Sequence, residues 1–121
     1  MEHPMYPDTT KEIARKRREL APEISSAFRA FGQRVFADGA LPEKTKQLIA
    51  VAVAHVTQCP YCIRGHTELA VQKGATEPEI MEAIWVAAEM RAGADYAHSV
   101  IAIDTMHRLH PAPADGPPTA T

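Results

Sequence analysis

The spacing of apolar residues along the chain predicts helices from end to end and almost no strand. Residues 8–20 form a mostly polar helical segment, which Pro22 interrupts or restarts. The next apolar residues recur at i, i+4, i+7 and i+11, the spacing of one helical face: Ile24, Phe28, Phe31 and Val35. Gly39 follows as a stop signal. The pattern therefore predicts an all-α fold.

A further helix is expected to begin at Pro42, with residues 48–54 apolar on every side. The β-branched residues in this run also suit a buried strand, but the length and the polar start favour a helix buried on most sides. This helix and the Ala- and Met-rich segment near Trp85 together carry more apolar surface than one small core readily hides. Such a surface is typical of a subunit interface, although a central helix in a compact bundle gives the same pattern.

The second half of the chain carries clear helix boundaries. A helix from Pro60 to Lys73 is expected to stop at Gly74, and Thr76 to Glu79 read as a capping box that opens the next one. That helix takes its apolar face from Ile80, Ile84, Ala87 and Ala88. A separate last helix is expected over residues 95–109. The segment 111–121 is rich in Pro and Ala, so we expect one helical domain over 1–110 and a disordered tail.

Length and charge exclude several function classes. A chain of 121 residues with a formal net charge of −2 is one domain without the basic surface that nucleic acid or an anionic membrane would require. No apolar stretch reaches the roughly 20 residues of a membrane span, and no apolar signal segment follows Met1. We therefore expect a cytoplasmic protein with no nucleic-acid or membrane partner.

The only two cysteines, Cys59 and Cys62, stand at CxxC spacing, and His66 follows four residues after Cys62. On a helix, residues four apart share a face at about 5–6 Å between Cβ atoms, so His66 is placed to take the proton of Cys62. Pro60 suits the first helical turn, which puts Cys59 at or near the N-cap. There the helix dipole lowers the pKa of its thiol. The pattern is typical of thiolate chemistry.

Two other interpretations of the same residues stay open. The cysteines are also compatible with a pair of buried, inert thiols. Alternatively His55, Cys59, Cys62 and His66 supply four nitrogen and sulfur ligands that zinc accepts. A zinc site would require His55 to fold back from the preceding helix.

A row of residues spaced by four leads toward the cysteine pair: Glu43, Gln47, Val51, His55 and Cys59. Residues at this spacing stay near one helix face. Gln47 and His55 are thus candidates to hydrogen-bond to His66 and orient it. A histidine inside an apolar run is equally explained as a core residue.

The segment 43–67, EKTKQLIAVAVAHVTQCPYCIRGHT, resembles the alkyl hydroperoxidase D-like group of the carboxymuconolactone decarboxylase superfamily. The similarity covers roughly residues 20–105. It implies an all-α fold assembled as a homotrimer or homohexamer. It also implies a peroxidase or disulfide reductase acting on hydrogen peroxide or organic hydroperoxides, without a cofactor. An external dithiol, lipoyl- or thioredoxin-like, would restore the enzyme.

The family's proton relay joins an acid twelve residues before the first cysteine to the histidine four after the second. The matching positions are Gln47, Cys59, Cys62 and His66, so a glutamine replaces the usual glutamate. An amide accepts no proton at neutral pH, so the relay would end at His66 or pass to His55 or Glu43. In the implied cycle Cys62 attacks the peroxide and Cys59 closes the disulfide, or the two exchange roles. Decarboxylase members of the superfamily lack the CxxC pair, so its presence argues against lactone decarboxylation. A decarboxylase-like lyase and a non-catalytic zinc-binding or structural oligomer are kept as the alternatives.

Overall fold

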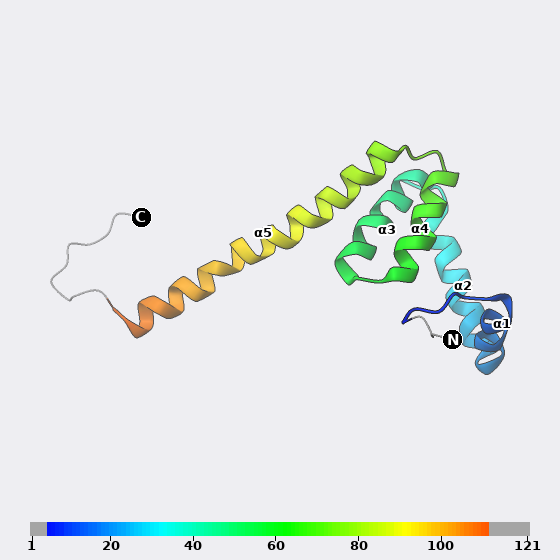
Figure 1. The fold of residues 1–121 in the computed structure, drawn as a ribbon, viewed down its shortest axis with the longest axis horizontal. Coiled ribbons are helices and arrows are strands. Elements are labelled where there is room, and N and C mark those ends of the chain that lie inside the picture. Colours follow the sequence, from blue (N-terminus) through cyan, green and yellow to red (C-terminus); the bar gives the residue numbers. More distant parts are fainter. Residues whose placement is uncertain (1–4, 112–121) are drawn as a thin grey trace.

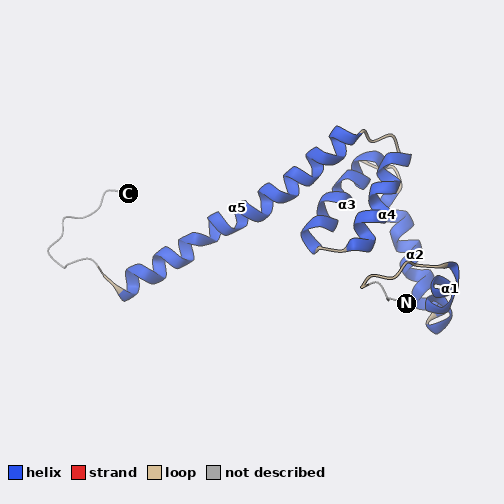
Figure 2. Cartoon of the chain, in the orientation of Figure 1, coloured by secondary structure: helices blue, strands red, loops and turns tan. Residues whose placement is uncertain are grey.

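The computed structural model describes residues 5–111, and every regular element in that range is a helix (Figure 2). There are five: α1 (Lys11–Leu20), α2 (Pro22–Phe36), α3 (Glu43–Thr57), α4 (Pro60–Gln72) and α5 (Glu77–Leu109). The prediction of an all-α fold is confirmed. The tail expected to be disordered lies outside the described residues, except for Pro111. No helix within 5–111 has both the length and the apolar character needed to cross a membrane.

The helix boundaries follow the local signals in the sequence. Thr10 caps α1 by accepting a hydrogen bond from the Ile13 N–H at 3.2 Å, and Pro22 occupies the first turn of α2. Gly74 follows α4 with φ +94°, a conformation that a side chain would strain. The expected end of that helix at Gly74 is therefore confirmed.

The packed part of the molecule is a bundle of α3, α4 and the first half of α5. Helix α3 contacts both of the others. Its centre is the fully buried Val51, which meets Ala70 and Ala75. Three partly buried side chains pack around this core: Leu48, Ile80 and Ile84. Because the core is small, α3 is not buried on most sides as predicted; Ile49 and Val53 remain about half exposed.

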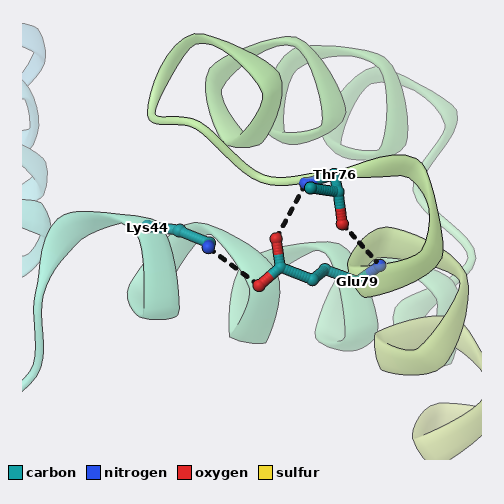
Figure 3. A network of polar contacts seen from close by, with 3 residues as sticks. All are labelled: Lys44, Thr76 and Glu79. Carbon is teal, nitrogen blue, oxygen red and sulfur yellow. Dashed lines mark hydrogen bonds and ion pairs between the residues drawn. The ribbon is translucent and has the colours of Figure 1, made fainter.

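A polar network fastens the start of α5 to the start of α3 (Figure 3). Thr76 Oγ1 accepts from the Glu79 N–H at 3.3 Å, and the Thr76 N–H donates to Glu79 Oε1 at 2.8 Å, which is the predicted capping box. The second oxygen of Glu79 pairs with Lys44 Nζ of α3 at 2.8 Å. One carboxylate therefore both caps α5 and joins it to α3.

Helix α5 is a single helix of 33 residues, so the prediction of a separate helix over 95–109 is wrong. Gly93 lies just before the expected break. A glycine inside a helix lowers the stability of the helix by about 1 kcal/mol relative to alanine, which does not by itself end the helix. Arg91 donates to the Val56 carbonyl of α3 at 3.3 Å. Beyond that contact α5 runs away from the bundle (Figure 1).

Helices α1 and α2 form a second projection, on the other side of the bundle (Figure 1). The end of α2 is held by Lys46 of α3, whose Nζ donates to the carbonyls of Val35 at 2.8 Å and Ala37 at 2.6 Å. The predicted apolar face of α2 is present, but Ile24, Phe28 and Phe31 are exposed rather than covered.

Candidate active site

The two cysteines lie at the start of α4. Cys59 is the N-cap, and its Sγ accepts a hydrogen bond from the Cys62 N–H at 3.2 Å. Pro60 stands in the first turn, where its missing N–H is not needed. Both cysteines are free thiols with intermediate exposure. The predicted N-cap position of Cys59 is confirmed, and the pair is open to solvent and to a reaction partner.

The two thiols differ in acidity. Hydrogen bonds from the Cys62 side chain, and then from the Cys62 backbone N–H, hold the pKa of Cys59 below that of an ordinary thiol. The same side-chain hydrogen bond raises the pKa of Cys62, and burial and repulsion from Cys59 add to it. Of the two thiols, therefore, Cys59 loses its proton more readily and Cys62 holds its proton more tightly.

His66, one turn after Cys62 on α4, is oriented by Gln47 of α3. Its Nδ1 lies 2.7 Å from Gln47 Oε1, and Gln47 is buried, with only 4% of its surface exposed. An amide oxygen only accepts, so Nδ1 carries the hydrogen and Nε2 keeps its lone pair. In the neutral ring this leaves Nε2 as the atom that can accept a proton. Gln47 holds the ring without supplying a negative charge to an imidazolium.

Phe36, the last residue of α2, stacks on the His66 ring. The ring centroids are 5.2 Å apart and the planes meet at 27°. The aromatic face and the Gln47 hydrogen bond hold the imidazole from two directions. Sequence spacing missed this contact because Phe36 falls one residue after the apolar stripe of α2. An aromatic residue directly before the turn into α3 was the only available signal.

Cys62 and His66 share the wall of a cavity of about 430 Å³. The remaining wall comes from α2 and α3 and is mostly apolar: Val35, Phe36, Ile49, Ala50, Val53 and Ala54. Lys46 and Thr57 are the other polar side chains on it. Cys59 does not line this cavity, so the two sulfurs face different surroundings.

The other residues of the predicted row do not meet His66. His55 Nδ1 hydrogen-bonds to the Val51 carbonyl of its own helix at 2.8 Å, and Glu43 is paired with Lys73. The expectation that His55 orients His66 is therefore not supported. Residues spaced by four share a helix face, but each step moves about 6 Å along the helix axis, so His55 lies two turns away from Gln47, which meets His66. Within residues 5–111, no three His, Cys, Asp or Glu side chains are grouped to hold a metal ion. The ligands of the zinc alternative do not converge.

The N-terminal segment lies over the first turn of α4, a contact that the sequence did not predict. The Tyr61 hydroxyl donates to the Pro7 carbonyl at 2.9 Å, and the Tyr6 ring meets the Tyr61 ring edge-on at 6.1 Å. Asp8 and Arg64 form an exposed ion pair at 3.4 Å. Tyr61, between the two cysteines, therefore serves as the attachment point of this segment.

The chain matches the sequence profile of a known protein family. The sequence profile of the Carboxymuconolactone decarboxylase family matches residues 22–105, which hold α2, α3, α4, most of α5, and Gln47, Cys59, Cys62 and His66. Among curated proteins, uncharacterised protein 4 of the cox locus of Paracoccus denitrificans is 63% identical over 86 residues. The aligned part covers 71% of this chain and 78% of that protein.

Two solved structures add to this similarity. A carboxymuconolactone decarboxylase family protein from Legionella pneumophila is 40% identical, with a TM-score of 0.61, covering 64% of this chain and 69% of that one. A protein of the same family from Thermotoga maritima, for which an antioxidative role has been suggested, is 26% identical with a TM-score of 0.52. The match covers 69% of this chain and 95% of the Thermotoga protein.

Proposed function

Because this chain belongs to the carboxymuconolactone decarboxylase family, we propose that it is a dithiol peroxidase that reduces hydrogen peroxide or organic hydroperoxides. The observation that carries the proposal is the position of Cys62 and His66 on one cavity wall, with Gln47 holding the Nδ1 hydrogen. This arrangement supplies a nucleophile, a base and room for a substrate. The antioxidative role suggested for the Thermotoga relative is consistent with it.

The first step is attack by Cys62. His66 Nε2 takes the Cys62 proton, and the resulting thiolate attacks one peroxide oxygen. The S–O bond forms while the O–O bond breaks, and the departing alkoxide or hydroxide takes the proton back from His66. Cys62 is thereby oxidised to the sulfenic acid and the peroxide is reduced to an alcohol or water.

The second step is disulfide closure by Cys59. Its lowered pKa makes its thiolate, which attacks the sulfenic sulfur, more available than that of an ordinary cysteine. The S–S bond forms and hydroxide leaves as water after taking a proton. An external dithiol, of lipoyl or thioredoxin type, then exchanges with the disulfide and returns both thiols. Apart from the peroxide and this dithiol, the proposed cycle uses only the side chains of Cys59, Cys62 and His66.

The apolar cavity wall suits the alkyl part of an organic hydroperoxide. Six of its ten residues are Ala, Val, Ile or Phe, so an alkyl chain bound there would be removed from water. Hydrogen peroxide is small enough to reach the same sulfur but gains nothing from that wall. We therefore expect the cavity to favour organic hydroperoxides.

The test is turnover of cumene hydroperoxide and hydrogen peroxide with dihydrolipoamide as reductant, comparing the wild type with Cys59→Ser and Cys62→Ser. We expect both variants to lose turnover, and dimedone to trap a sulfenic acid on Cys62 in Cys59→Ser. Trapping only on Cys59 in Cys62→Ser would reverse the roles of the two cysteines. Wild-type turnover no faster than that of the double variant would refute the proposal.

A further inference from the structure

A short segment that precedes α1 lies against the first turn of α4 (Figure 1). We call residues 6–8 the strap. The Tyr61 hydroxyl donates a hydrogen bond to the Pro7 carbonyl at 2.9 Å, and the Tyr6 ring meets the Tyr61 ring edge-on at 6.1 Å. Tyr61 stands between the two cysteines in the sequence. The strap is therefore attached at the residue that separates the two sulfurs along the chain.

Charge contributes to the same contact. Arg64, three residues after Tyr61 on α4, pairs with Asp8 of the strap at 3.4 Å. The first turn of α4 carries no acidic side chain, and the positive end of the helix dipole lies there. We call Tyr61 and Arg64 together the α4 surface. It binds an aromatic ring, a backbone carbonyl and a carboxylate that are presented by three consecutive residues.

The strap is held by contacts that another molecule can replace. The side chains of Arg64 and Asp8 are 61% and 88% exposed, and every residue of the strap is exposed. Exposed ion pairs and hydrogen bonds compete with water, so they hold a segment only weakly. The strap also lies outside residues 22–105, which match the family profile. A partner that offers the same three groups can therefore take its place.

The α4 surface lies beside the sulfur that the cavity does not reach. Cys62 lines the cavity, whereas Cys59 and Tyr61 do not. Cys59 is the N-cap of α4 and is partly exposed. A dithiol that reduces the pair without entering the cavity therefore meets Cys59, and it arrives next to Tyr61.

We propose that the α4 surface is the docking surface for the reductant, and that the strap occupies it as a competitor within the same chain. The partner is a protein dithiol that presents a carboxylate and a backbone carbonyl close to its thiol, because the strap shows that Arg64 and Tyr61 bind these groups. This inference rests on the proposed function, in which an external dithiol restores the two thiols.

The exchange takes place once the strap has left the α4 surface. A thiolate of the reductant attacks Cys59 Sγ, the Cys59–Cys62 bond breaks, and Cys62 leaves as a thiolate and takes a proton. The second thiolate of the reductant then attacks the reductant sulfur of the mixed disulfide. Cys59 leaves as a thiolate and takes the other proton. The reductant becomes a disulfide, and both cysteines of this chain are reduced.

The first test asks whether the strap competes. The disulfide of the full-length protein is made with the thiol oxidant diamide, and its reduction is timed with the peptide Cys-Tyr-Pro-Asp, capped at both ends, and with dithiothreitol. We expect Tyr6→Ala to react with the peptide roughly threefold faster than the wild type, because the competitor is loosened. Dithiothreitol, which needs no docking surface, should react within about twofold of its wild-type rate.

Tyr96→Ala is the matched control, because Tyr96 is an exposed tyrosine of α5. It should leave both rates unchanged. If Tyr6→Ala loses helical content by circular dichroism, Asp8→Asn replaces it. A peptide rate in the loosened variant equal to that of the wild type would overturn the proposal.

The second test asks whether the α4 surface selects a carboxylate. In the Tyr6→Ala background, Cys-Tyr-Pro-Asp should react roughly threefold faster than Cys-Tyr-Pro-Lys, the size expected of one exposed ion pair. Each rate is divided by the rate of the same peptide with hydroxyethyl disulfide, which removes differences in thiol reactivity. Adding Arg64→Glu should abolish this preference, whereas Arg29→Glu, the same charge change on α2, should keep it.

Equal normalised rates for the two peptides, or a preference that Arg64→Glu leaves intact, would equally overturn the proposal. Peroxide is absent from every step of both tests. A protein without peroxidase activity therefore still gives a definite result here, and the proposed function is tested separately.

Discussion

The bundle and the two projections differ in what their apolar residues contact. In the bundle, Val51 is fully buried, and the same helix aligns Gln47 with His66 on α4. On α2 and on the second half of α5, Phe28 and Val100 are as apolar but mostly exposed. The bundle therefore positions the candidate site within one chain, whereas the projections expose apolar side chains that the rest of the described chain does not cover. Val35 and Phe36, at the end of α2, are the residues of α1 and α2 that line the cavity at the site.

The largest expected effect compares Val51→Ala with Val100→Ala. Truncating a fully buried valine removes burial and leaves a cavity, which we expect to cost about 2 kcal/mol, or roughly 30-fold in the unfolding equilibrium. Val100→Ala should change stability by less than about 0.5 kcal/mol at dilutions where the chain is single. Urea unfolding at several protein concentrations measures both. An equal, concentration-independent loss at Val100 would break the distinction between the regions.

Next in size is the substitution of Gln47, which lies inside the bundle and is buried. A glutamate at this position would stabilise protonated His66, and general bases contribute about 10²–10⁴-fold, so we expect Gln47→Glu to speed disulfide formation by roughly tenfold. Gln47→Met, similar in volume but without an acceptor, should slow it. Stopped-flow measurement of thiol loss at equal folded fraction checks both. Unchanged rates in both variants would mean that His66 acts without Gln47.

A smaller effect concerns the pH dependence of Cys59. Its pKa is lowered chiefly by hydrogen bonding from the Cys62 side chain, so its thiolate persists to lower pH than that of an ordinary cysteine. Removing that donor in Cys62→Ala should raise the pKa and slow alkylation of Cys59 by iodoacetamide at neutral pH. Cys62→Ser keeps a hydroxyl donor and should retain more of the reactivity. Identical pH profiles of alkylation in the two variants would mean that the lowered pKa of Cys59 comes from the hydrogen bond of the backbone N–H at position 62 and not from the side chain there.

The smallest expected effect is that of His55→Ala. His55 bonds to the Val51 carbonyl of its own helix, so removing it should leave the rate of disulfide formation within about twofold of the wild type once folded fractions are matched. A much larger fall would return His55 to the proton relay that the spacing suggested. Ser26→Glu is the control, because Ser26 is an exposed residue of α2 that lines neither the cavity nor the surroundings of His55.

Local signals were sufficient for the helix boundaries and for the cysteine pair. Thr76 with Glu79, Gly74 and Cys59 each act within four residues, so their roles are visible in the sequence. The continuity of α5 was missed because Gly93 weakens a helix without ending it. The Phe36–His66 stack joins residues thirty positions apart, and the hydrogen bond of His55 to the Val51 carbonyl could not be read from the spacing by four. Contacts between different helices depend on how the helices pack, so they can be identified only from the three-dimensional structure.

The most direct test of the central claim, that Cys59 and Cys62 form a redox-active pair, is an anaerobic thiol count with mass spectrometry. We predict two free thiols per chain before treatment and none after one equivalent of peroxide. A loss of two hydrogens within a single chain should accompany this change, and dihydrolipoamide should reverse it. Two free thiols persisting after excess peroxide would contradict the account.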